Sequence, residues 1–83
     1  MKIQENISWK VLQDKVVAVN TTTGIYYTMN AVASEIWQSI ADGADKDAIL
    51  AKLKENYPDV EEAMLVADLD EQIQYWVSEN LIV

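Results

Sequence analysis

The segment GIYYTMNAVASEIWQSIADG, residues 24–43, marks the point where the chain changes from strand periodicity to helix periodicity. Residues 25–29 are mainly aromatic and β-branched, which is typical of a strand. From Asn30 onward, apolar residues recur every three or four positions, as they do along one face of a helix. Asn30 can cap the first turn of this helix, and Gly43 can end it. The segment therefore predicts a strand that leads directly into a helix.

Upstream of this segment the sequence predicts two more strands. Residues 7–12 alternate apolar and polar side chains, and the apolar run 16–19 follows after the short interruption Gln13-Asp14. The loop 20–24 ends in Gly24, which can adopt the positive φ that a tight connection needs. These connections are too short for a crossover helix, so the strands must pair antiparallel. The prediction is a three-stranded meander whose first and third strands are edges.

Downstream, the sequence predicts two further helices. Asp45 can cap the first of them, and Pro58 ends it because proline disfavours helical backbone at the preceding residue. Asp59 lies three residues before Glu62, a variant of the capping box, and predicts the start of a third helix that runs to about Glu79. The predicted apolar stripe of that helix consists of Leu65, Leu69, Ile73, Trp76 and Val77. The predicted fold class is α+β, a three-stranded antiparallel β-meander followed by three helices, in a single domain over residues 1–83.

The composition predicts a small folded protein of the cell interior. Of its 83 residues 51% are hydrophobic, which is enough for one packed core. It contains no cysteine, so packing must stabilise it without disulfides, as a reducing compartment allows. No apolar run is long enough for a signal peptide or a membrane span. We therefore expect a cytoplasmic protein with no membrane partner.

The charge of the chain limits the kinds of partner that it can bind. The chain has fourteen acidic residues, six lysines and no arginine, which gives a net charge of −8. Beyond Glu55, seven carboxylates follow without a single lysine. Such a chain is repelled by nucleic acid and by anionic lipid, so neither is an expected partner. The acidic last third is either a solvated face or a surface that attracts a basic partner.

The two flanks of the third helix differ in character. At 100° per residue, the first flank collects an aromatic ring, a thioether, an amide and carboxylates, the mixture that peptide grooves use. Its members are Met64, Asp68, Glu71, Gln72, Tyr75 and Glu79. The second flank is mostly small or neutral. We interpret the first flank as a contact surface; the alternative is that Tyr75 and Met64 only widen the core stripe.

Catalysis and DNA binding are both disfavoured. The chain has no histidine and no cysteine, which removes the usual general base, the thiol nucleophile and most transition-metal ligands. The aspartates at 42, 45 and 47 lack the spacing, glycine and closing glutamate of a calcium loop. The lysines of the second helix are offset by neighbouring carboxylates, so it lacks the basic surplus of a recognition helix. We expect no catalytic residue, no metal and no cofactor.

Several of these segments together resemble a known family. The run Gly24-Ile25-Tyr26-Tyr27-Thr28-Met29-Asn30, the pair Ile36-Trp37, the turn Asp42-Gly43 and the stretch from Asp68-Leu69 through Leu81-Ile82 are similar to the PqqD-like family, whose members are called RiPP recognition elements. The resemblance covers the chain from about Ile7 to Ile82. Where the family often has glycine before the final leucine and leucine before the helix-opening asparagine, this chain has Asn80 and Met29.

The resemblance implies a winged helix-turn-helix-like domain that performs no chemistry and binds the leader segment of a ribosomally made precursor peptide. The leader would lie as an added strand between the third strand and the third helix, which is β-augmentation. The docking strand would then be Ile25, Tyr26, Tyr27, Thr28 and Met29, and the opposite wall would be Met64, Asp68, Glu71, Gln72 and Tyr75.

A recognition domain without a fused enzyme must act on a separate processing enzyme. The resemblance favours the lasso-peptide type, which delivers the precursor to a leader peptidase. The alternatives are a peptide chaperone for a radical-SAM enzyme in pyrroloquinoline quinone synthesis, and a structural subunit that binds no peptide. Such a domain needs a second contact surface, and we expect Trp9 either to pack in the core or to belong to that surface on the outer face of the first hairpin.

Overall fold

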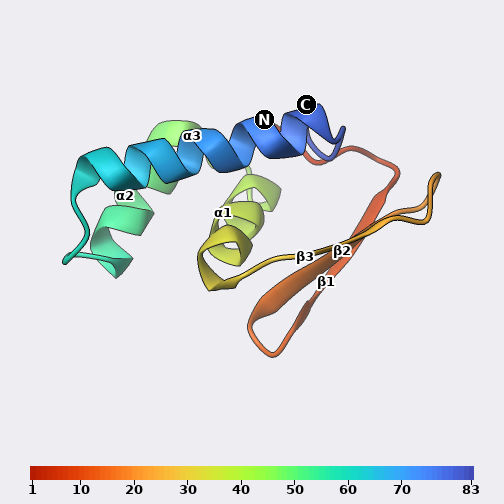
Figure 1. Ribbon diagram of the computed structural model, residues 1–83, viewed down its shortest axis with the longest axis horizontal. Coiled ribbons are helices and arrows are strands. Elements are labelled where there is room, and N and C mark those ends of the chain that lie inside the picture. The colour runs from red at the N-terminus through yellow and green to blue at the C-terminus, as the bar shows by residue number, and fades with distance from the viewer.

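The computed structural model describes all residues of the chain, 1–83, and confirms the predicted fold class (Figure 1). Three antiparallel strands in the order β1-β2-β3 precede three helices. The elements are β1 (Ile7–Leu12), β2 (Lys15–Asn20), β3 (Tyr26–Thr28), α1 (Ala31–Ala41), α2 (Lys46–Asn56) and α3 (Glu62–Ser78). The two outer strands are edges, as predicted. No helix is both long and apolar enough to cross a membrane.

The strands are joined by tight turns whose residues take left-handed backbone angles. Gln13 and Asp14 have φ of 52° and 66°, which are the angles that a two-residue hairpin of the favoured twist requires. Gly24 has φ of 78° in the loop before β3. The third strand is shorter than the predicted 25–29, but Ile25 and Met29 still bond to β2 through backbone groups, so the ladder continues past both ends.

The helix boundaries follow the predicted caps in two cases of three. The side chains of Asn30 and Asp45 accept hydrogen bonds of 2.8 Å from the N–H groups three residues ahead, at the starts of α1 and α2. The capping box predicted at Asp59 is wrong: Glu61 is the N-cap of α3 and makes no side-chain cap bond. The reason is local, because residues 57–60 form a turn closed by the Val60 N–H on the Tyr57 carbonyl, and the helix begins only after it.

The core lies between the sheet and the three helices. Trp37 is fully buried and packs edge-to-face against Trp76, with 5.2 Å between ring centroids, and against Trp9 at 6.3 Å. Trp9 therefore lies on the helix-facing side of the sheet, at its margin, and not on the outer face of the hairpin. Ser34 of α1 is also fully buried, and its hydroxyl accepts the Val16 N–H at 2.8 Å, which fixes α1 to β2.

The stripe of α3 is narrower than predicted. Leu65, Leu69 and Trp76 are buried and Ile73 is partly buried, whereas Val77 is half exposed and does not belong to the core. Beyond α3, Asn80 takes φ of 60° and turns the chain so that residues 81 and 82 enter the core. An antiparallel bridge between Ile3 and Ile82 then ties the two termini together. Figure 1 shows both termini together at the C-terminal end of α3.

Candidate functional site

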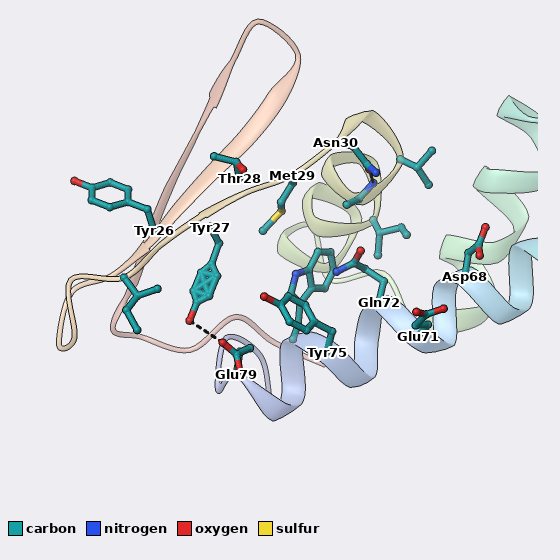
Figure 2. Close-up of a pocket in the computed structure, with 15 residues that line it drawn as sticks. Tyr26, Tyr27, Thr28, Met29, Asn30, Asp68, Glu71, Gln72, Tyr75 and Glu79 are labelled. Carbon is teal, nitrogen blue, oxygen red and sulfur yellow. Dashed lines mark hydrogen bonds between the residues drawn. The ribbon is translucent and has the colours of Figure 1, made fainter.

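The main hollow of the molecule is a groove between β3 and the first flank of α3, with α1 forming its floor (Figure 2). Its volume is about 810 Å³. The floor is apolar, and most of its residues belong to α1. It consists of Met29, Val32, Ala33, Ile36 and Trp76. A cavity of this volume can accept an extended segment of several residues.

One wall of the groove is the unpaired edge of β3. The Ile25 carbonyl accepts the Asn20 N–H at 2.9 Å, and the Met29 N–H donates to the Val16 carbonyl at 3.0 Å, so the odd-numbered residues of this segment bond to β2. Backbone groups alternate sides along an antiparallel strand. The N–H and C=O groups of Tyr26 and Thr28 therefore point away from β2, towards the groove. This edge can form backbone hydrogen bonds with another extended chain.

The side chains of β3 divide between the two faces of the sheet. Tyr27 shares a face with buried Ala18, and its hydroxyl donates to Glu79 Oε1 at 3.3 Å across the end of the groove. Desolvation, followed by the negative charge and hydrogen bond of Glu79 and by nearby Tyr75, raises the pKa of Tyr27 above its usual value. Tyr27 is therefore a neutral donor at physiological pH. Figure 2 shows the Tyr26 ring pointing away from α3, so Tyr26 contributes mainly its backbone to the groove.

The other wall carries negative charge without a counter-ion. Asp68, Glu71 and Glu79 line the groove, and we call them the acidic wall. No lysine is among the lining residues. By contrast, two carboxylates of α3 outside the groove form ion pairs, Asp70 with Lys46 and Glu62 with Lys54. Two of the three lysines of α2 thus pair with carboxylates outside the groove, and no lysine pairs with the acidic wall.

The structure brings most of the predicted site residues together. All of the ten except Met64 line the groove, and Met64 is 58% exposed outside it, one turn before Asp68. The α1 residues of the floor and Trp76 carry no signal of a binding site in the sequence, because their apolar periodicity is that of core residues. Glu79 has a sequence signal, since it shares the helix flank with Tyr75, and the structure places it at the groove. No group of three His, Cys, Asp or Glu side chains lies close enough to hold a metal ion.

The chain as a whole is similar to known proteins. The family model described as coenzyme PQQ synthesis protein D (PqqD) matches residues 15–82. A solved structure described as TbiB1 in complex with the TbiA(beta) leader peptide is 26% identical, with a TM-score of 0.93 over 99% of this chain and 94% of that chain. A second, a lasso peptide synthetase B1 complexed with the leader peptide, is 20% identical with a TM-score of 0.89 over 99% and 95% of the two chains, and shows likeness of fold. No curated protein sequence matches the chain.

Proposed function

The chain belongs to the PqqD family, and on that premise we propose that it binds the leader segment of a ribosomally made precursor peptide as a strand added to β3. The observation that carries the proposal is the free edge of β3, whose Tyr26 and Thr28 backbone groups face a groove of about 810 Å³. Backbone pairing of this kind gives affinity, and the pockets beside it select the sequence. The similar TbiB1 structure, which holds a leader peptide, supports the same use of this fold.

A leader docked on β3 would present its side chains alternately to two environments. Neighbouring strands lie about 4.8 Å apart, so the leader would occupy the space between β3 and α3. One set of its side chains would then face the apolar floor, Tyr27 and Tyr75. The other set would face the solvent side of the sheet. Apolar leader residues at alternate positions should therefore supply most of the affinity, because they bury surface on Met29, Ile36 and Trp76.

The chain would act as a recognition element that performs no reaction itself. We infer that it presents the bound leader to a separate processing enzyme, and we favour the leader peptidase of a lasso-peptide system because one solved structure of the same fold is described as a lasso peptide synthetase B1 complexed with the leader peptide. The family description favours a second candidate, a peptide chaperone for a radical-SAM enzyme in pyrroloquinoline quinone synthesis. Both roles use the same groove and differ in the leader that it accepts.

The test uses a proline substitution that removes one backbone donor from the groove. Thr28→Pro deletes an N–H that points to the groove, and proline is tolerated on an edge strand at such a position. The matched control is Val11→Pro on β1. There the Thr21 N–H bonds to the Asn6 carbonyl, so the even-numbered residues pair with β2 and the Val11 N–H also points outward, but at the opposite edge.

We expect calorimetry with synthetic lasso and quinone-precursor leaders to show one leader binding to the parent and to Val11→Pro alike. Thr28→Pro should bind it at least about tenfold more weakly, because it loses a hydrogen bond and places a ring against the incoming strand. Circular dichroism would verify that both variants are folded. Equal binding by both folded variants would refute docking on β3, and choice between the two leaders would separate the two candidate roles.

A further inference from the structure

The face of the sheet turned away from the helices is uncovered, and we call it the outer face. Val17 pairs with Lys10 on one side and with Thr28 on the other, and Val19 pairs with Tyr26. Paired residues point to the same side of a sheet, so these side chains share the outer face. Leu12 and Lys15 extend the row towards the hairpin turn. Leu12 is 48% exposed and Tyr26 is 72% exposed. A second, smaller hollow lies here and includes Lys10, Val17, Val19 and Tyr26 among its lining residues.

The outer face differs in charge from the rest of the molecule. The three strands contain no carboxylate, although the chain as a whole carries a net charge of −8. Lys10 and Lys15 lie on this face, and neither has a carboxylate within 4.0 Å, whereas Lys46 and Lys54 are both paired. The outer face is therefore an apolar patch with unpaired positive charges at its margin.

From this pattern we propose that the outer face is a second docking surface, which binds a protein partner through an apolar centre flanked by carboxylates. The inference rests on the proposed function, since the partner would be the enzyme that processes the captured leader. Interfaces with an apolar centre and a charged rim gain specificity and association rate from complementary charge. A leader strand added at β3 would continue the same sheet face beside Tyr26, so the enzyme would lie next to the captured peptide.

Other occupants fit the outer face less well. A symmetric contact between two copies would bring the lysines of one outer face against those of the other, which is unfavourable. A nucleic acid or an anionic membrane would meet only two lysines here and a strong net negative charge elsewhere. A protein partner needs only local complementarity, because charges further away than about 8 Å are largely screened at physiological salt.

Charge reversals on and off the outer face test the proposal. Lys10→Glu and Lys15→Glu change the outer face, and Lys52→Glu makes the same change of charge at an exposed, unpaired lysine of α2. The probes are a purified leader peptidase of a lasso-peptide system and a purified radical-SAM enzyme of quinone synthesis, each titrated into the labelled chain with saturating leader. Leader affinity is measured separately for every variant.

We expect Lys10→Glu and Lys15→Glu each to weaken association with one of these enzymes by at least about threefold, because repulsion adds to the lost attraction. Lys52→Glu should behave like the parent, and all variants should bind leader within about twofold of it. Equal association of all variants with the enzyme, or no association by a leader-bound parent, would overturn the outer-face proposal alone. So would Lys10-dependent binding to anionic vesicles or duplex DNA in place of the enzyme. Failure of the parent to bind any leader would overturn the proposed function, and this proposal with it.

Discussion

Replacing Asp68 by Asn should weaken leader binding modestly, and replacing it by Lys should weaken it more. The acidic wall has no cation among the groove-lining residues, so we expect the leader to present at least one Lys or Arg towards Asp68, Glu71 or Glu79. An exposed ion pair contributes about 0.2 to 1 kcal/mol. Asp68→Asn should therefore raise Kd by roughly 1.4- to 5-fold. Asp68→Lys adds repulsion of similar size, which brings the total to roughly 2- to 30-fold.

Stopped-flow association of a labelled leader at several salt concentrations would measure this effect. Added salt shortens the screening length from about 8 Å at physiological ionic strength to about 3 Å at 1 M. The on-rate of the parent should therefore fall with salt, and it should fall less steeply for Asp68→Asn. The control is Asp59→Asn, which removes the same charge from an exposed turn outside the groove. An on-rate that is independent of salt in all three proteins would show that the acidic wall is only a solvated face.

Three further predictions concern the framework of the groove. Ser34→Ala should destabilise the protein by about 1–3 kcal/mol in urea unfolding, because the buried Val16 N–H loses its acceptor; a smaller loss would mean that the N–H finds another partner. Gly24→Ala should lower the free energy of unfolding by about 1–2 kcal/mol, because Gly24 has a left-handed φ of 78° that alanine disfavours, even though a Cβ there would meet no neighbour; Gly24→Asn should lower it less. Equal stability of Gly24→Ala and the parent would show that the loop relaxes. Because the pKa of Tyr27 is raised in the folded protein, its contribution to stability is constant below about pH 10 and is lost as pH rises through the raised pKa. Tyr27→Phe should therefore lose less stability than the parent above pH 10, and identical unfolding free energies of the two proteins at every pH would refute the raised pKa.

Local signals in the sequence were sufficient for most of the fold. Asn30 and Asp45 each precede a helical apolar pattern, and each caps its helix as predicted. Asp59 offered the same kind of signal, but Pro58 and its neighbours form a turn that delays the helix by two residues. A cap is thus predictable where the residues before it leave the backbone free, and it shifts where a turn competes for the same residues.

The site was less predictable, because it depends on how distant elements meet. The helical wheel grouped Met64 with Asp68, but the groove includes only the part of α3 that lies opposite β3. The sequence also does not show which backbone N–H groups of β3 are free. That follows from the hydrogen bond between the Asn20 N–H and the Ile25 carbonyl, which fixes the register of β3 against β2. The alternation around Trp9 does not show which face of the sheet its side chain occupies. Only the contact between Trp9 and Trp37 assigns it to the side that the helices cover.

Amide hydrogen exchange at Thr28 tests the central claim most directly. In the free protein the Thr28 and Tyr26 N–H groups point to the groove, whereas alternation directs the Tyr27 N–H to β2. Residue-resolved exchange measured by NMR, with and without saturating leader, would compare these three neighbours. Docking as an added strand predicts strong slowing at Thr28, slowing at Tyr26 if the leader reaches that far, and little change at Tyr27. A leader that binds tightly yet leaves the Thr28 exchange rate unchanged would contradict the account.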